Sequence, residues 1–298
     1  MVYHVPALLD ESINGLNIRP TGIYVDVTFG GGGHSREILN RLTTGRLIAF
    51  DQDEDAEKNI PDDKRFTFLN QNFRFLKNNL RYIGINSVDG IIADLGVSFH
   101  QFDEPSRGFT FRHDTELDMR MNRKSNVKAS DLLANLPENE LGDIFFRFGE
   151  LTNSRKIARC IVESRIQKPL RTVSDITAVI GKLIPFRQEN KFYAKLFQAL
   201  RIAVNHEIDY LKEMLEQSLE LLNSGGRLVV LTYHSIEDRI VKDFMRTGSL
   251  TGEETKDFFG NSSTPFRLIS RKAITPGEEE IAVNNRARSA KLRIAEKM

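Results

Sequence analysis

The segment VDVTFGGGGHS, from Val25 to Ser35, constrains the fold of this chain more than any other. A run rich in apolar residues ends in four consecutive glycines, and a segment of helical character follows. Glycine has no Cβ, so Gly30 to Gly33 allow positive φ angles and a close approach to a ligand. The helix that begins near His34 directs its unpaired N–H groups toward the space above the loop. The segment therefore predicts the first strand, loop and helix of an α/β sheet.

Asp51 closes the next predicted strand, LIAFD, 21 residues after Gly30. In nucleotide-binding sheets an acid about 20 residues beyond the glycines hydrogen-bonds ribose hydroxyls. The spacing therefore predicts an adenosine-containing cofactor. The alternative is a glycine-rich connection in an ordinary α/β domain.

Two residues around the glycines bear on which cofactor this is. A dinucleotide fingerprint needs G-x-G-x-x-G, and Ser35 stands where the third glycine belongs when counting from Gly30. Asp26, just before the loop, can receive the ammonium of an amino-acid moiety. These features favour S-adenosylmethionine over NAD. The alternative for Asp26 is a buried acid that accepts hydrogen bonds from the N–H groups of the loop itself.

Composition limits the class of protein. The chain has 298 residues, enough for one large domain or two smaller ones, and its single cysteine, Cys160, excludes an internal disulfide. No stretch approaches the roughly 20 apolar residues that cross a bilayer, and the N-terminal residues do not form a signal peptide. No Cys/His cluster has metal-ligand spacing, so no metal is expected. We expect a cytoplasmic protein without a membrane or metal partner, and a homodimer is left open.

The net charge of +1 conceals a strong segregation. Residues 147–201 hold 12 Lys and Arg against 4 Asp and Glu, a local charge of +8, and residues 284–298 add +4. The rest of the chain must then sum to −11. This pattern predicts a basic face that binds an anionic polymer such as RNA, and a solvated helical surface is the alternative.

Apolar patterning predicts the order of the elements. Strands are expected at 23–29, 46–51, 65–70, 88–95 and 226–233, and PFRLISRK and ARSAKLRIAE predict a final antiparallel edge pair. Residues 130–185 read as several short helices, with a cap at Ser130 and a break at Pro137. A helix near Phe197 to Leu222 carries an apolar stripe of Ile208, Leu211, Leu215 and Leu222.

This order predicts an α/β fold in which an all-helical domain interrupts the sheet. We place the first part of the sheet domain at 1–106, the inserted helical domain at 107–194 and the second part at 195–298. Ligands of such sheets bind beyond the carboxyl ends of the strands. The glycine loop, Asp51, the segment ADLGVSFHQFD and the segment TYHSIEDR all follow strands there. Phe73 follows the third strand and is either an adenine contact or a core aromatic.

Several strings resemble one family closely. They are GLNIRPTGIYVDVTFGGGGHS, DGIIADLGVS, RGFTF, LDMRM, FQALRIAVNHEI, GGRLVVLTYHSIEDRIVK and NNRARSAKLR. Together they resemble the bacterial MraW (RsmH) family of ribosomal RNA small subunit methyltransferases, over nearly the whole chain. The resemblance implies a class I, Rossmann-like methyltransferase fold with an inserted helical domain. It also implies S-adenosylmethionine-dependent methylation of a cytidine N4 in the decoding region of 16S rRNA, on the small ribosomal subunit.

The resemblance carries the family's cofactor contacts to seven positions of this chain. They are Gly32, Gly33, His34, Asp51, Phe73, Asp94 and Gln101. The chain departs from the family pattern at Gly31, at Phe99 and His100, and at Asn285.

The chemistry of the acceptor points to Asp94. The lone pair of cytosine N4 is delocalised into the ring, so hydrogen-bond acceptors must orient the amine toward the methyl group. Asp94 and the carbonyls of Leu95 and Gly96 are the candidates, and a strong general base is unnecessary because the product ammonium is acidic.

Other residues are expected to hold the RNA. Phe99, Phe109 and Tyr233 are candidates for stacking on a flipped base, and Arg107 and Arg120 for binding phosphates. Three residues of the inserted domain are further candidate phosphate contacts, namely Arg155, Lys156 and Arg159. His234 either faces the substrate or precedes a capping box of Ser235 and Asp238.

Two other classes of function remain open on the sequence. One is a nicotinamide-dependent oxidoreductase, and the other is a nonenzymatic factor that binds the ribosome.

Overall fold

The computed structural model describes residues 6–185, 187–253 and 264–298. The chain divides into two compact units, one of Met1–Gly96 with Ile208–Met298 and the other of Val97–Glu207. The boundaries that the sequence suggests for the inserted domain, 107 and 194, both lie inside the second unit.

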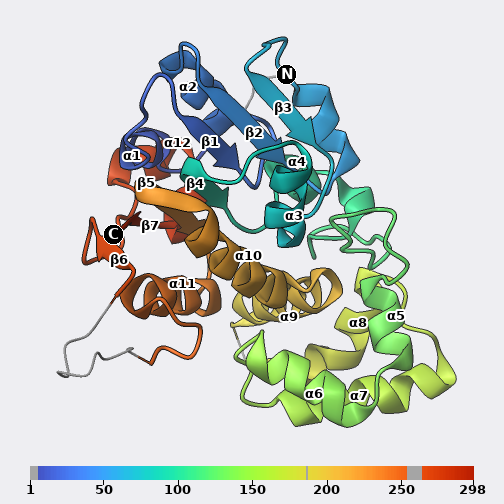
Figure 1. Cartoon of the computed structure of the whole chain (residues 1–298). Helices are drawn as coiled ribbons and strands as arrows, with labels where there is room; N and C mark the ends of the chain where they lie inside the picture. The colour runs from blue at the N-terminus through green and yellow to red at the C-terminus, as the bar shows by residue number, and fades with distance from the viewer. Residues whose placement is uncertain (1–5, 186, 254–263) are drawn as a thin grey trace. The chain divides into compact units, whose positions relative to one another are not determined.

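In the described part of the first unit, seven strands form one sheet in the order β3-β2-β1-β4-β5-β7-β6 (Figure 1). The pairing is parallel from β3 to β5, while β7 runs antiparallel to both β5 and β6. Both the parallel series and the antiparallel edge pair are as predicted from the sequence. The strands are β1 Ile23–Asp26, β2 Arg46–Phe50, β3 Phe66–Leu69, β4 Val88–Asp94, β5 Leu222–Thr232, β6 Phe266–Leu268 and β7 Lys291–Lys297.

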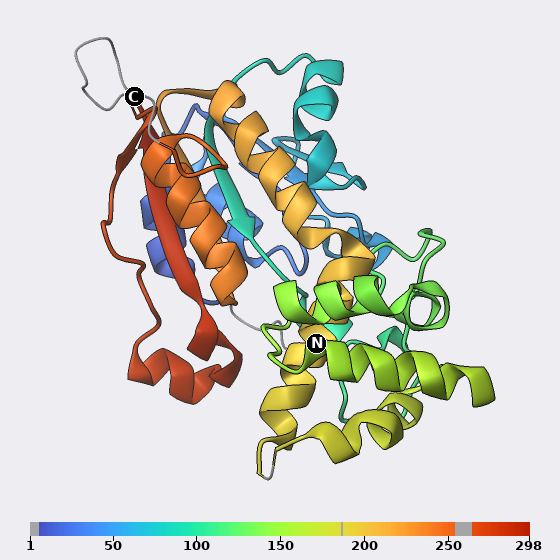
Figure 2. The same ribbon diagram turned by 90° about the horizontal axis from the view of Figure 1, so that it is seen from below.

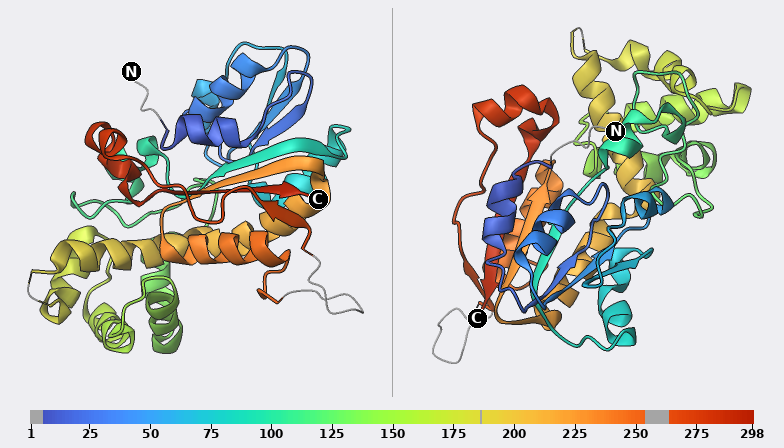
Figure 3. Two further views of the ribbon diagram at one scale, coloured as in Figure 1. Left: turned by 90° about the vertical axis from the view of Figure 1, so that its left-hand side faces the viewer. Right: turned by 90° about the horizontal axis from the view of Figure 1, so that it is seen from above.

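Helices cover both faces of this sheet, as the left view of Figure 3 shows. Alternate strand residues point to opposite faces, so Tyr24 joins the apolar cluster beneath α1 and α2 whereas Val25 joins the one beneath α10 and α11. The sheet is therefore buried on both sides, and its ligands must approach from an edge. The helical segments are α1 Leu9–Gly15, α2 Gly33–Arg41, η1 Glu54–Asn59, η2 Phe73–Phe75, α3 Leu76–Tyr82, α10 Glu207–Leu221, α11 Ser235–Thr247, α12 Glu278–Val283 and η5 Asn285–Ser289.

The second unit is helical and has an apolar core of its own (Figure 2). Its helical segments are α4 Phe99–Asp103, η3 Pro105–Arg107, α5 Ala129–Asn135, α6 Glu138–Arg147, α7 Ser154–Gln167, α8 Val173–Ile180, η4 Gly181–Leu183 and α9 Glu189–Asn205. The predicted break at Pro137 separates α5 from α6. The predicted cap at Ser130 is wrong, because α5 begins earlier, at Ala129, and the N–H of Lys128 is bound by the Asp131 carboxylate at 2.8 Å.

The single helix predicted from Phe197 to Leu222 is two helices. His206 adopts a left-handed φ of 51° and ends α9, and α10 follows. The amide of Asn205 anchors this end of α9, since it donates to the Met119 carbonyl and accepts from the Met121 N–H, both at 2.7 Å. The stripe residues Ile208, Leu211 and Leu215 are buried as expected. Leu222 instead begins β5.

Candidate active site

The glycine loop connects β1 to α2 and is shaped by left-handed glycines. Gly30 has a φ of 50°, and Gly32, the cap residue of α2, has a φ of 74°. A Cβ on Gly32 would lie 2.9 Å from the Phe29 ring, which packs against Phe66 and Phe68 at centroid distances of 5.3 Å. The ring cannot move aside easily, so both sterics and φ require glycine here.

Asp51 lies beyond the end of β2 and holds the glycine loop. Its Oδ2 accepts the Gly30 N–H at 2.7 Å and its Oδ1 accepts the Asp53 N–H at 2.9 Å. Burial raises the pKa of Asp51 to about 6, although these two hydrogen bonds act in the opposite direction. Each carboxylate oxygen has a second lone pair, so Asp51 can still accept from a ribose hydroxyl.

Asp26 ends β1 and is almost completely buried. Its Oδ1 accepts the Thr28 N–H at 3.1 Å and its Oδ2 accepts the Ser35 hydroxyl at 2.7 Å. Burial raises its pKa to about 6. These contacts match the second interpretation of Asp26, in which a buried acid accepts hydrogen bonds from its own loop. They also give Ser35 a structural role at the position where a dinucleotide fingerprint has its third glycine.

Asp94 ends β4 and, unlike Asp26, is partly exposed. Its N–H donates to the Thr28 hydroxyl at 2.6 Å, and its Oδ1 accepts the Tyr233 hydroxyl at 2.8 Å. The pKa of Asp94 is raised to about 7, first by burial and then by the negative charges of Asp26 and Glu237, while the hydrogen bond from Tyr233 lowers it. Nearly a quarter of the side chain, 23%, is exposed.

His34, in the first turn of α2, faces Asp94 from the glycine loop. Its Nδ1 lies 3.9 Å from Asp94 Oδ2, which is beyond hydrogen-bond distance. Its Nε2 is buried and has no hydrogen-bond partner among the described residues. Burial lowers the pKa of His34 to about 4, so the imidazole is neutral near pH 7 and adds no positive charge to the acids around it.

Tyr233, His234 and Glu237 form the junction between β5 and α11. The Tyr233 N–H donates to the Glu237 carboxylate at 3.0 Å, and His234 caps α11 by accepting the Glu237 N–H at 3.4 Å. His234 Nε2 is within 3.1 Å of a Glu237 oxygen but lacks hydrogen-bond geometry. The helix cap expected at Ser235 thus lies one residue earlier, at His234 itself.

The capping box predicted from Ser235 and Asp238 is wrong. Asp238 is instead bound by Arg293 at 2.7 Å and Lys291 at 3.1 Å, and these cations lower its pKa against the opposing effect of burial. Asp238 thus ties α11 to β7.

A family model described as the MraW methylase family matches residues 1–298. This chain belongs to the MraW methylase family.

Relatives within the family are similar over their full length. A protein of Bacteroides fragilis named ribosomal RNA small subunit methyltransferase H is 57% identical over 296 residues, which are 99% of this chain and 97% of that protein. The protein of that name from Flavobacterium johnsoniae is 55% identical over 299 residues, 100% of this chain and 99% of its own. An rRNA methylase structure from Streptococcus thermophilus is matched with a TM-score of 0.45 and 13% identity, covering 100% of this chain and 99% of that chain.

The other cofactor positions implied by the MraW resemblance have clear structural surroundings. Gly33 begins α2. Phe73, in η2, is partly buried and packs against the core cluster beneath α10 and α11. It therefore has the role of a core aromatic, and its contact with an adenine stays a prediction. In the second unit, the side-chain oxygen of Gln101 accepts the Ser98 N–H at 3.1 Å and forms a capping box at the start of α4. Phe99, in the same turn, is partly exposed.

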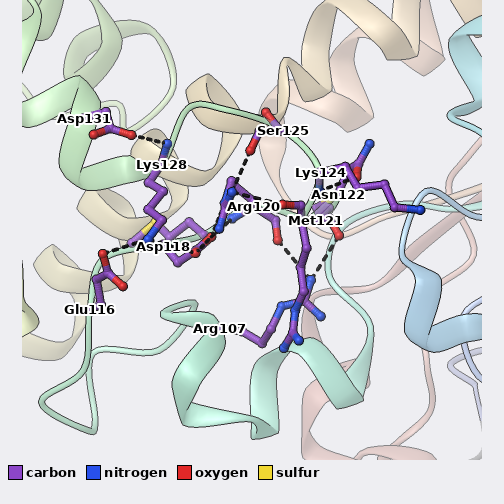
Figure 4. Close-up of polar contacts among 12 residues, drawn as sticks. Arg107, Glu116, Asp118, Arg120, Met121, Asn122, Lys124, Ser125, Lys128 and Asp131 are labelled. Atoms are coloured by element: carbon purple, nitrogen blue, oxygen red, sulfur yellow. Dashed lines mark hydrogen bonds and ion pairs between the residues drawn. The ribbon is translucent and has the colours of Figure 1, made fainter.

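Three residues predicted to contact RNA have structural roles inside the second unit, and Figure 4 shows two of them, Arg107 and Arg120, with their partners. Arg107 is 2% exposed and donates to the carbonyls of Arg120 and Met121, both at 3.0 Å. Arg120 binds the Asp118 carboxylate through two nitrogens, at 2.7 and 2.8 Å. Phe109 is 6% exposed and belongs to the core. These three side chains therefore have structural roles in the second unit, and their contact with RNA stays a prediction.

The basic residues predicted on the inserted domain lie at its surface. Arg155 is paired with Asp143 at 2.9 Å and Arg159 with Glu138 at 3.5 Å. Lys156, between them on α7, is exposed.

Sequence reasoning missed two residues that support Asp94. Thr28 holds its N–H and Glu237 raises its pKa. Thr28 was signalled by its place between the strand and the glycines. For Glu237 no local signal existed, because its effect depends on contacts that form only in the folded sheet.

Proposed function

We propose that this chain uses S-adenosylmethionine to methylate the exocyclic N4 of a cytidine in the decoding region of 16S rRNA. The observation that carries the proposal is Asp94, a partly exposed carboxylate at the end of β4 in a chain of the MraW methylase family. Its Oδ1 is bound to Tyr233, while its Oδ2 accepts no hydrogen bond from the described residues. That oxygen is the acceptor that an amine needs.

The electrostatics of the site suit a positively charged cofactor. Burial raises the pKa values of Asp26, Asp51 and Asp94 to about 6, 6 and 7, and the charged groups that act on Asp94 are themselves acids. Neutral His34 does not offset them. A sulfonium and an ammonium would restore the missing positive charge and lower these pKa values.

The loop residues provide the rest of the binding site. Gly32 and Gly33 allow close approach at the start of α2, and Asp51 has lone pairs for the ribose diol. Phe73 lies beyond the neighbouring strand, β3, where its partly exposed ring can pack on an adenine. Gln101, in the second unit, is proposed as a further cofactor contact on the MraW resemblance alone.

The residues orient the amine rather than activate it strongly. When bound, S-adenosylmethionine supplies a methyl group whose bond to sulfur breaks with both electrons left on the sulfur as the bond to N4 forms. Asp94 Oδ2 accepts an N–H of the amine, which directs the nitrogen lone pair toward that methyl group. The nitrogen then loses one proton, to Asp94 or to water. Orientation of the amine toward the methyl group supplies most of the acceleration.

The proposed RNA substrate rests on two observations. The relatives at 55–57% identity are named as methyltransferases of small-subunit ribosomal RNA. The basic excess of residues 147–201 supplies charge that suits a polyanion, with Lys156 as an exposed example. The ribosomal substrate implies activity in the cytoplasm.

The test is methyl transfer from labelled S-adenosylmethionine to purified small subunits and to naked 16S rRNA. The wild-type protein should label one of these substrates, and Asp94→Asn should lose the activity while still folding. The matched control is Asp89→Asn at the opposite end of β4, where Asp89 binds Arg19, Asn223 and the Ile23 N–H. No label from the wild type would overturn the proposal, and an active Asp94→Asn would overturn the role of Asp94.

A further inference from the structure

The sequence suggested that Tyr233 stacks on a flipped base, whereas its contacts in the structure point to the carboxylate of Asp94. We propose that Tyr233 is a positioning residue that holds Asp94 so that its Oδ2 is presented to the substrate amine. This inference rests on the proposed function, because it concerns the same carboxylate.

The first support is the unequal use of the two oxygens of Asp94. The Tyr233 hydroxyl donates to Oδ1 at 2.8 Å. Oδ2 lies 3.9 Å from the His34 Nδ1 and has no hydrogen-bond partner among the described residues. A carboxylate with one oxygen fixed has its other oxygen fixed in direction as well.

The second support is that Tyr233 is itself firmly placed. It follows directly after β5, which pairs with β4 so that Asp94 lies opposite Leu231. Its backbone N–H is bound by the Glu237 carboxylate at 3.0 Å. Tyr233 thus approaches Asp94 from a rigid neighbouring strand, which suits a residue that orients another.

The third support is the position of the ring. Gly96, with a φ of 96°, turns the chain just after Asp94, and a Cβ on Gly96 would lie 3.8 Å from the Tyr233 ring. The ring therefore lies beside the DLG segment and reaches along it to the carboxylate. This placement explains why a hydroxylated ring stands here, since phenylalanine would fill the same space without reaching Oδ1.

Electrostatics make Tyr233 a permanent donor. Burial raises its pKa well above the usual value, and Asp94, Glu237 and Glu280 raise it further, so the phenol keeps its proton. The groups that face Asp94 are Tyr233 and Glu237 from the β5–α11 junction, Asp26 from β1 and His34 from α2. Tyr233 lowers the pKa of Asp94, whereas the two acids raise it.

The test compares Tyr233→Phe with Tyr24→Phe. Tyr24 is a buried phenol at the opposite end of the sheet, where its oxygen accepts the Arg19 N–H at 2.7 Å. Two quantities are measured in each protein. The first is the pH dependence of methyl transfer to the substrate that the wild-type protein labels, and the second is the pKa of Asp94, measured by carboxyl-carbon NMR without cofactor. In Tyr233→Phe we expect the Asp94 pKa and the acid limb of the activity profile to rise by about one pH unit. The rate at the optimum should also fall about tenfold or more, while Tyr24→Phe should leave both quantities unchanged.

A second variant tests the same role if Tyr233→Phe does not fold. Replacement of Tyr233 alone by 3-fluorotyrosine keeps the hydroxyl and makes it a stronger donor, so the Asp94 pKa and the acid limb should move to lower pH. An unchanged Asp94 pKa in either folded variant would overturn the positioning role. A wild-type protein that transfers no methyl group would instead contradict the proposed function, and the NMR measurement would still decide the role of Tyr233.

Discussion

The Asp51 carboxylate accepts a hydrogen bond from the Gly30 N–H at 2.7 Å, and this contact joins the end of β2 to the glycine loop after β1. The acid that the sequence assigns to a ribose is thus also a structural part of the loop. Asp51 and the loop therefore form one unit, and a change in the shape of the loop should be felt in cofactor binding.

Gly32→Ala should weaken the binding of S-adenosylmethionine at least tenfold. The new Cβ would lie 2.9 Å from the Phe29 ring, which Phe66 and Phe68 hold in place, so the loop must shift. The left-handed φ adds about 1–2 kcal/mol of strain. Isothermal titration calorimetry measures the effect.

Gly225→Ala is the matched control for this prediction. Gly225 has a similar φ of 79°, but a Cβ there meets nothing within 4 Å. It should lose stability through strain and keep its affinity for the cofactor. Equal affinities in the two variants would contradict the account of the loop.

Asp26→Asn should change how the stability of the cofactor-free protein depends on pH. Burial raises the pKa of Asp26 from 3.8 to about 6, so the protonated acid is favoured in the folded state. Its contribution to stability is fully present below about pH 4 and is lost as the pH rises through 6. Relative to the asparagine variant, the wild type should lose about 3 kcal/mol in all, of which about 2 kcal/mol is lost between pH 4.5 and 7.5.

Urea unfolding at several pH values between 4.5 and 7.5 checks the Asp26 prediction. Asp63→Asn serves as the control, because hydrogen bonds from Arg65 lower the pKa of the partly exposed Asp63 to about 2. The effect of Asp63→Asn on the free energy of unfolding should be constant above pH 4.5. A difference between wild type and Asp26→Asn that does not vary with pH would refute the buried, protonated acid.

Lys156→Ala should reduce the salt dependence of RNA binding, whereas Arg107→Gln, which also removes one positive charge, should not. An exposed lysine that neutralises a phosphate contributes about one unit to the slope of log affinity against log salt. Arg107 is buried and donates to two carbonyls, so its replacement should lower the melting temperature instead. Filter binding at several salt concentrations measures the slope. A smaller slope in a folded Arg107→Gln protein would show that Arg107 contacts a phosphate after all.

The sheet and its loop were predictable because their signals are local. Apolar runs marked the strands, the four glycines marked the turn, and Asp51 followed at a characteristic spacing. Asp94 was found in the same way, since it directly follows a buried strand. Each of these predictions needs only neighbouring residues and the rule that ligands bind at the carboxyl ends of parallel strands.

The partners of these residues were not predictable. The Tyr233 hydroxyl meets Asp94 across 139 positions of sequence, and only the pairing of β4 with β5 brings them together. Arg107 looked like a surface cation, but the carbonyls that hold it come from a loop that folds around it. The break at His206 depends on the anchoring of Asn205 by distant backbone groups. Such contacts leave no periodic pattern in the chain.

The most direct test of the central claim is mass spectrometry of 16S rRNA fragments from cells with and without this gene. The account predicts that one cytidine of the decoding region carries an N4-methyl group in the parent strain and lacks it in the deletion strain. The wild-type gene should restore the methyl group, and the gene with Asp94→Asn should not. Identical fragment masses in the parent and deletion strains would contradict the account.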